Sequence, residues 1–242
     1  MQNLKNTFDD FNLHARIIPA LITILPIYIY LLLKNLITDS FIQSFLPSSV
    51  TYILLVALFY RIVRNFGKRY EDRMYKELGA KPTTIILRYS NNFIDTATKT
   101  RYHKKLNKNI EGAELPIEKE KETSDDDEKY ESAINWLRKY ANSNRDKETR
   151  VYQELTDYNF WRNLYGGKWI AVTSCIILII IECFQLGKQN IMELIKNPYP
   201  QITVLFIMIL ILIISCVVIN KKTVKGKAFD YAKTLLEVCD SL

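Results

Sequence analysis

Four apolar runs divide the sequence, and each approaches the length that a helix needs to cross a membrane. They cover residues 17–33, 46–60, 169–186 and 202–219. A helix of about 20 apolar residues spans a bilayer core of about 30 Å. The fourth run has no charged residue and the third has one, Glu182. The runs therefore predict an all-α membrane protein with four transmembrane helices in two hairpins.

A long polar segment separates the two hairpins and predicts a domain inserted between the second and third spans. We assign residues 1–63 to the first hairpin, 64–167 to the inserted domain and 168–220 to the second hairpin. Residues 221–242 form an amphipathic C-terminal helix, which we expect to dock on the inserted domain or on a neighbouring subunit.

Helical periodicity predicts that the inserted domain is all-helical and joined to the spans by continuous helices. Gly79 is expected to end the helix that leaves the second run, Pro82 to start another, and Asp95 to cap a third. A last helix near residues 148–165 runs into the third span, whereas residues 111–128 predict a loop. The apolar residues that recur every four positions after the second run are Phe66, Tyr70, Met74 and Leu78.

Charge is distributed unevenly along this domain. Residues 61–108 contain 13 Lys and Arg against 4 Asp and Glu, whereas residues 109–131 contain 3 against 10. The short loops between spans carry only Lys34, Lys188 and Lys196. Because positive residues stay on the inner side, both termini and the inserted domain are expected to be cytoplasmic. The richness in Ile, Lys and Asn is typical of bacteria with AT-rich genomes, so we expect a bacterial inner membrane.

Motifs of enzymes and metal proteins are missing from the sequence. It has no phosphate-binding loop, no His-Glu-x-x-His, no nucleophile elbow and no Cys-x-x-Cys. The only histidines are His14 and His103, and the four cysteines lack the spacing of metal ligands. We therefore expect no enzymatic activity, no metal and no cofactor.

One cluster in the basic part mixes cations with aromatic rings. Phosphates need Arg or Lys donors and unstacked bases need flat side chains, so this mixture suits a nucleotide or a short oligonucleotide. The alternative is a basic collar that faces lipid headgroups, with the tyrosines in the core. The candidate ligand-binding residues are Arg88, Arg101, Tyr102, His103 and Lys104.

Two further places could take part in gating. Arg162 lies among aromatic residues just before the third span, and Gly166 and Gly167 would let the entering helix bend. The alternative is an ordinary belt of interfacial aromatics. Glu182 could form an outer ring of carboxylates in an oligomer, or it could simply reach the outer interface.

Several stretches of the inserted domain are distinctive in their wording: 79–84 (Gly-Ala-Lys-Pro-Thr-Thr), 87–88 (Leu-Arg), 98–103 (Thr-Lys-Thr-Arg-Tyr-His), 115–116 (Leu-Pro) and 158–164 (Tyr-Asn-Phe-Trp-Arg-Asn-Leu). These stretches resemble a family of small bacterial multi-span proteins of anti-phage defence operons, the membrane effectors of the Hailong type. The chain departs from the family pattern at 78–80, where Trp-Gly-Gly would be expected, and at 158–162, where Tyr-Gly-Phe-Arg-Arg would be.

The resemblance implies an oligomeric ion channel that is closed at rest and opens when a nucleotide signal binds. A cognate nucleotidyltransferase would make that signal, a nucleotide or short oligonucleotide, and opening would depolarise the membrane. The alternative is a membrane-anchored sensor or scaffold that recruits a soluble defence partner through the acidic strip, residues 111–131. A third alternative, a small transporter, would need more polar groups near mid-membrane than the spans contain.

Overall fold

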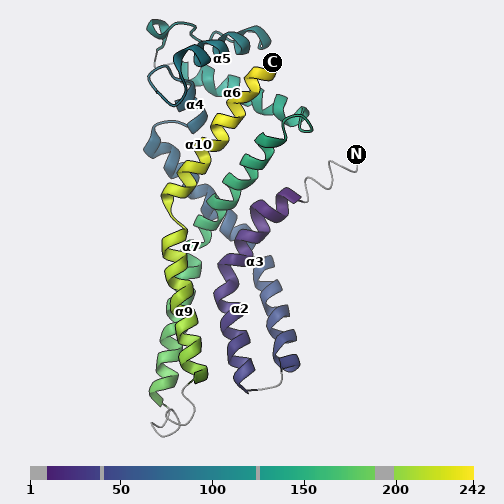
Figure 1. The fold of residues 1–242 in the computed structure, drawn as a ribbon, viewed down its shortest axis with the longest axis vertical. Helices are drawn as coiled ribbons and strands as arrows, with labels where there is room; N and C mark the ends of the chain where they lie inside the picture. Colours follow the sequence, from purple (N-terminus) through teal and green to yellow (C-terminus); the bar gives the residue numbers. More distant parts are fainter. Residues whose placement is uncertain (1–9, 39–40, 124–125, 189–198) are drawn as a thin grey trace. The chain divides into compact units, whose positions relative to one another are not determined.

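The computed structural model describes residues 10–38, 41–123, 126–188 and 199–242 (Figure 1). In these residues every regular element is a helix, which confirms the all-α prediction. Lys196, one of the loop lysines from which the membrane orientation was predicted, lies outside the described residues. So do residues 124 and 125 of the acidic strip. The α-helices are α2 (Ile18–Thr38), α3 (Phe41–Leu78), α4 (Pro82–Leu87), α5 (Thr96–Asn109), α6 (Asp126–Ser143), α7 (Thr149–Lys188), α9 (Tyr199–Val218) and α10 (Lys221–Glu237).

Three helical segments are long and apolar enough to cross a membrane: Asp10–Lys34, Ser48–Leu87 and Thr149–Gly187. A fourth is present if Ile202–Val218 and Lys221–Ser241, two helices with a break between them, count as one span. The chain therefore has the helices of a membrane protein, and the first segment includes a π-helical turn, η1 (Leu13–Ile17).

The chain folds into two compact units. The first, which we call the span unit, contains Met1–Tyr70 and Asn159–Val224. The second, the polar unit, contains Glu71–Tyr158 and Lys225–Leu242. The chain passes from one unit to the other within α3, within α7 and within α10. Most of the C-terminal helix thus belongs to the same unit as residues 71–158.

Two long helices each join an apolar run to the polar segment without a break, as the periodicity of the sequence predicts. α3 has 38 residues and ends at Leu78, directly before Gly79, whose φ of +78° an L side chain rarely adopts. Pro82 then occupies the first turn of α4, as predicted. α7 has 40 residues and passes through Gly166 and Gly167 without a break.

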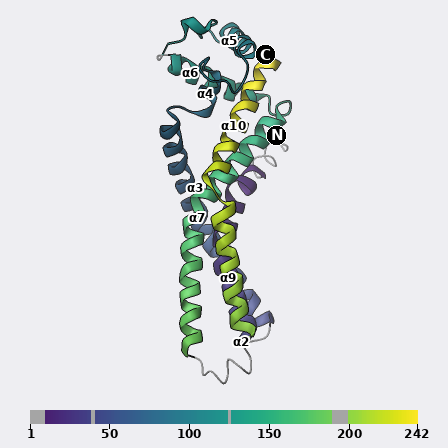
Figure 2. The same cartoon turned by 60° about the vertical axis from the view of Figure 1, so that its left-hand side comes forward.

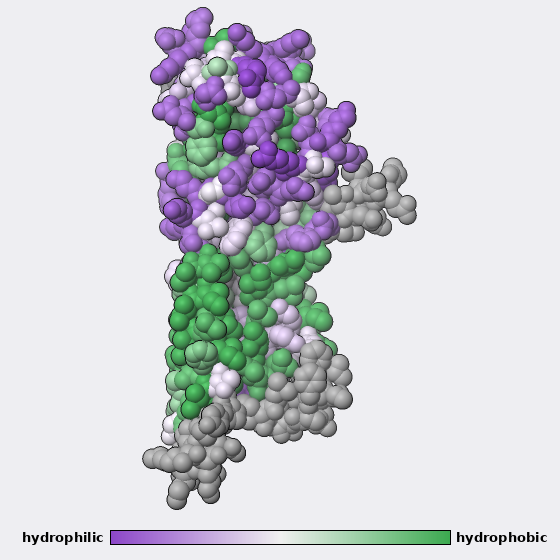
Figure 3. Space-filling view, viewed as in Figure 1, coloured by the Kyte–Doolittle hydropathy of each residue, from purple (hydrophilic) through white to green (hydrophobic). Residues whose placement is uncertain are grey.

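The span unit has an apolar surface and a core in which small residues bring helices close together. Figure 3 shows apolar side chains covering its visible face along α9. Inside, α2 packs on α3 through Ala20, Ile24 and Val63. α2 also packs on α9, where Tyr30 meets Met208. The views in Figures 1 and 2 agree that α7 and α9 lie side by side.

The polar unit has one hydrophobic core, to which α10 contributes. Residues of α4, α5 and α6 form most of it. Phe229, Leu235 and Leu236 of α10 are buried in the same cluster. Of the two docking sites that the sequence left open for the C-terminal helix, the structure shows packing on the core of the polar unit. Buried core residues with no more than 4% exposure include Ile86, Leu87, Tyr102, Leu106, Tyr130, Leu137, Leu235 and Leu236.

Candidate ligand pocket

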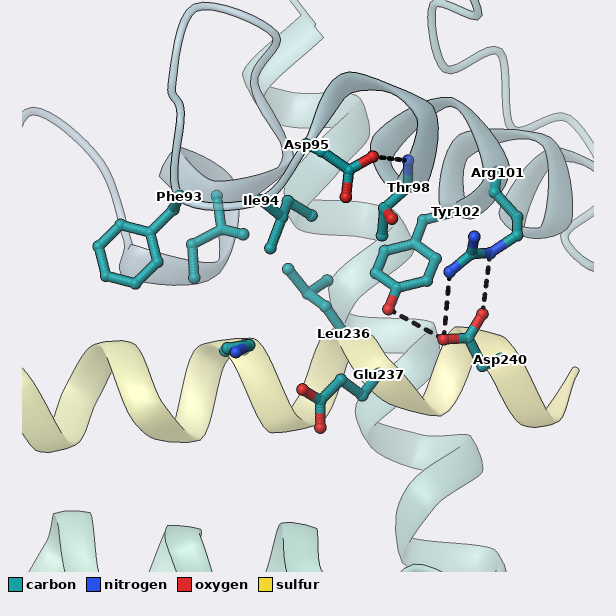
Figure 4. Close-up of a pocket in the computed structure, with 11 residues that line it drawn as sticks. Phe93, Ile94, Asp95, Thr98, Arg101, Tyr102, Leu236, Glu237 and Asp240 are labelled. Carbon is teal, nitrogen blue, oxygen red and sulfur yellow. Dashed lines mark hydrogen bonds and ion pairs between the residues drawn. The ribbon is translucent and has the colours of Figure 1, made fainter.

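The polar unit contains a pocket of 570 Å³ between α10 and the first turns of α5 (Figure 4). Figure 4 shows Phe93 and Ile94 at one end and Arg101 with Asp240 at the other. Phe93 remains 53% exposed, although its ring stacks on Phe229 with a centroid distance of 4.9 Å. The pocket therefore pairs an aromatic, apolar end with a charged end. Its lining residues are Ile86, Phe93, Ile94, Asp95, Thr98, Arg101, Tyr102, Lys233, Leu236, Glu237 and Asp240.

The start of α5 sets the positions of the pocket residues on that helix. The Asp95 side chain accepts a hydrogen bond from the backbone N–H of Thr98 at 2.8 Å, as expected of the N-cap that the sequence predicts. Hydrogen bonding to Thr98 lowers the pKa of the Asp95 carboxyl, so it stays ionised. Thr98, Arg101 and Tyr102 then share one face of the helix because they are three and four positions apart.

Three donors of α5 hold Asp240, which lies in the short 3-10 helix after α10 (Val238–Ser241), and we call this group the C-terminal latch. Arg101 Nε lies 3.0 Å from Asp240 Oδ1, and Arg101 Nη2 lies 3.4 Å from Oδ2. The Tyr102 hydroxyl donates to Oδ2 at 3.1 Å, and Lys105 Nζ donates to the Asp240 carbonyl at 2.9 Å. Burial, together with the neighbouring Asp240, raises the pKa of Tyr102. A carboxylate of the chain thus occupies the anion-binding end of the pocket.

Of the five ligand-binding residues predicted from the sequence, only Arg101 and Tyr102 line this pocket. Arg88 instead pairs with Asp127, with 2.8 Å between its Nε and Oδ1. Lys104 is exposed and lies outside the pocket lining. The cluster in the sequence is therefore spread over several sides of α5 and the loop before it.

His103, the fourth of these residues, is fully buried in the core of the polar unit. Its Nδ1 donates to the carbonyl of Pro116 at 2.6 Å, because that oxygen can only accept. The rings of Tyr89 and Tyr130 lie 5.1 and 5.3 Å from the imidazole. Burial lowers the pKa of His103, so the ring is neutral at pH 7. This environment makes His103 a core residue that anchors the loop after α5.

Several carboxylates of the acidic strip have partners within the polar unit. Glu131 pairs with Lys81 at 2.7 Å. The Glu122 carboxylate accepts from the backbone N–H of Tyr89 at 2.9 Å and from the Tyr130 hydroxyl at 2.8 Å. The predicted loop is therefore held against the helices by specific hydrogen bonds.

Sequence reasoning missed the residues that α10 and the turn after it contribute to the pocket: Lys233, Leu236, Glu237 and Asp240. It also missed Lys99, which is 1% exposed and donates from Nζ to the Arg88 and Asn91 carbonyls. The amphipathic pattern of residues 221–242 was the available signal for the α10 residues. A helix that docks on the polar unit through its apolar face also brings the polar residues beside that face to the unit's surface.

The predicted gating glycines lie where α7 crosses other helices of the span unit. A Cβ on Gly166 would come within 2.6 Å of the Val63 carbonyl oxygen and 2.8 Å of the Gly67 Cα. A Cβ on Gly167 would lie 2.9 Å from the Thr23 methyl group. The described geometry gives these glycines a packing role, and bending at this point stays a prediction.

Arg162 and its neighbour Asn163 are buried at the same crossing. The Arg162 guanidinium donates to Asn163 Oδ1 at 3.2–3.3 Å, and Asn163 Nδ2 donates to the Ala15 carbonyl at 2.6 Å. Pro19, four residues after Ala15, has no N–H to offer that carbonyl. The amide of Asn163 supplies a donor there and ties α7 to the turn before α2.

Glu182 is fully buried within the span unit. Its carboxylate pairs with Lys34, with Nζ 3.0 Å from Oε2, and accepts from the Tyr30 hydroxyl at 3.2 Å. The same ammonium donates to Gln185 at 2.6 Å. In this chain Glu182 ties α7 to α2, and an outer ring of carboxylates in an oligomer stays a prediction.

Comparison of the sequence with protein families and with characterised proteins, and of the fold with solved structures, found no match.

Proposed function

We propose that this protein is a ligand-gated membrane effector, an oligomeric ion channel of a bacterial anti-phage defence system. In this proposal a nucleotide or short oligonucleotide, made by a cognate nucleotidyltransferase, binds the polar unit on the cytoplasmic side of the inner membrane. Binding opens a pore formed by several copies of the chain, and ion flow depolarises the membrane. A homo-oligomer is needed because four spans of one chain leave little room for a pore.

The observation that carries the proposal is the pocket with the C-terminal latch at one end. An exposed aromatic residue, Phe93, offers a base a surface on which to stack. Arg101 presents a guanidinium fork, the group that best matches phosphate oxygens. A phosphate and the Asp240 carboxylate need the same donors, so the ligand and the latch exclude each other at this end.

The charges of the pocket favour this competition. Asp95 is engaged as a helix cap, and Glu237 pairs with Arg150 at 3.2 Å. Lys233, the second cation of the lining, has no ion pair among the residues that the structure describes. Loss of the Asp240 contact would therefore leave Arg101 and Lys233 facing an anionic ligand.

The junction between α9 and α10 supports the proposal that ligand binding in the polar unit is transmitted to the α9 span. Lys168 of α7 donates to the carbonyls of Cys216 and Ile219 at 2.9 and 2.7 Å, and so caps the end of α9. Asn220 accepts from the Thr223 N–H at 3.0 Å and starts α10. α10 follows the α9 span directly, so release of the latch at one end of α10 would act on the span at the other.

A binding experiment tests the pocket. We would measure fluorescence anisotropy of labelled short oligonucleotides and cyclic dinucleotides with the full-length protein in detergent. Asp240→Asn should bind the probe severalfold more tightly than wild type, because the competing charge is gone. Asp230→Asn removes the same charge from an exposed position on α10 and should change nothing. Arg101→Gln should abolish binding, and equal affinities for all four proteins would refute the pocket.

The second candidate function, a scaffold that recruits a soluble defence partner, depends on the exposed part of the acidic strip. Glu111, Glu114 and Glu120 are exposed and form no ion pair in the described part of the chain. Because Leu115 and Glu122 hold the same loop in place, deleting the strip would disturb the fold. The better test replaces the three exposed acids by Gln: loss of a co-purifying partner with unchanged ligand response would favour the scaffold.

A further inference from the structure

A second cavity lies in the span unit, between the first turns of the first span and one face of α3. Its volume is 510 Å³. The α3 residues that line it recur at helical spacing, three and four positions apart. Ile53 is 65% exposed, as expected of a side chain that faces lipid. The lining residues are Asn12, Arg16, Ile17, Ile53, Val56, Ala57 and Tyr60. We call this cavity the interfacial groove.

Positive charge gathers at the groove, and none of its described lining residues is a carboxylate. Arg16 lines the groove and is close enough to Arg64 and Arg162 for mutual electrostatic repulsion. Arg16 and Arg64 form no ion pair with the residues that the structure describes. The guanidinium carbon of Arg16 lies 5.6 Å from the centroid of the Phe11 ring. Arg16 and Arg64, at the end of a membrane span, thus have no carboxylate paired with them among the described residues.

The polar rim of the groove also has unused hydrogen-bonding capacity. Asn12 Oδ1 is buried and has no hydrogen-bond partner in the described residues. The Tyr60 hydroxyl accepts from Arg61 Nε at 2.8 Å, which leaves its own proton free to be donated. The rim thus offers donors for phosphate oxygens and an acceptor for a hydroxyl group.

We propose that the interfacial groove is a binding site for one anionic phospholipid of the cytoplasmic leaflet. An acyl chain lies along Ile17, Ile53 and Ala57, and the headgroup phosphate binds Arg16. A phosphatidylglycerol headgroup also carries hydroxyls that suit the Asn12 oxygen. Free phosphate would use only the charged end, so the apolar lining favours a lipid. The site is separate from the ligand pocket and does not depend on the proposed function.

Native mass spectrometry of the full chain in detergent, with added phosphatidylglycerol or phosphatidylcholine, tests this site. Wild type should retain one phosphatidylglycerol in preference to phosphatidylcholine. Arg16→Gln should lower that affinity by about fivefold, the effect of one cation at a lipid surface. Ala57→Phe keeps every charge but fills the groove, and it should weaken binding as well. Circular dichroism verifies that each variant is folded.

The matched control is Lys68→Gln, an exposed cation of α3 outside the groove lining. It should retain phosphatidylglycerol like wild type. Equal retention of both lipids, or an equal loss in Lys68→Gln and Arg16→Gln, would overturn the site in favour of general attraction to a basic surface. Glycerol 3-phosphate carries the same phosphate without acyl chains. Binding of this compound as tight as that of the lipid would overturn the role of the apolar lining.

Discussion

Substitution of Gly166 by Ala should weaken the span unit, because the new methyl group would meet backbone rather than mobile side chains. The Cβ would lie 2.6 Å from the Val63 carbonyl oxygen and 2.8 Å from the Gly67 Cα. Ordinary contacts are about 3.5–4.0 Å long, so α3 and α7 would have to separate by roughly 1 Å. Overpacking of this kind typically costs about 1–3 kcal/mol.

The matched control lies in the same helix. A Cβ on Gly187 would meet no atom within 4 Å, so Gly187→Ala brings the helix-forming advantage of Ala, about 1 kcal/mol, without a clash. That advantage also offsets part of the cost at Gly166, which leaves a net destabilisation of about 1–2 kcal/mol there. Gly167→Ala should fall between the two, since the Thr23 side chain that it would meet can rotate.

Denaturant titration in detergent micelles, followed by circular dichroism, measures these differences. We expect the stability order Gly187→Ala, then Gly167→Ala, then Gly166→Ala. If Gly166 served only as a flexible joint, Ala would stiffen the helix without a clash. Gly166→Ala would then be at least as stable as Gly187→Ala, and that result would refute the packing argument.

Three further predictions concern buried polar groups. His103→Gln should flatten the acid side of the stability profile in pH-dependent denaturation. Burial lowers the pKa of His103, so stability is lost as the pH falls below 6.5, where the unfolded ring takes up a proton, and an unchanged slope in the variant would contradict this. Lys34→Met should lower the free energy of unfolding by about 3 kcal/mol, because it leaves the buried Glu182 carboxylate without its cation. Glu182→Gln should lower it by only about 1 kcal/mol, because Lys34 is partly exposed and reaches water. Equal losses of stability in denaturant titration would contradict this. Lys99→Met should cost about 1–3 kcal/mol by leaving two carbonyls without their donor, and an unchanged unfolding midpoint would show that water replaces the ammonium.

The helices were predictable because their signals are local. Four-residue spacing from Phe66 to Leu78 implied that α3 continues beyond the apolar run, and Gly79 and Pro82 marked the next boundary. Asp95 was recognisable as a cap from its place before a helix. Each of these inferences needs only neighbouring residues and backbone geometry.

The candidate site was only half predictable, because helical rotation separates residues that are adjacent in sequence. Tyr102 faces the pocket, whereas His103 points into the core and Lys104 is exposed. The partner of Arg101 is Asp240, 139 positions away, and no local pattern reveals such a pair. For the same reason the glycine pair suggested a hinge, since the helices packed against Gly166 are not visible in its own segment.

Ion flux from liposomes that contain the purified full-length protein tests the central claim most directly. The measurement compares wild type with Asp240→Asn and Arg101→Gln, with and without short oligonucleotides and cyclic nucleotides. We expect flux only with one class of ligand for wild type, flux at lower ligand concentration for Asp240→Asn, and no ligand response for Arg101→Gln. Folded, inserted protein that remains silent across all ligands and variants would contradict the gated channel and favour the scaffold.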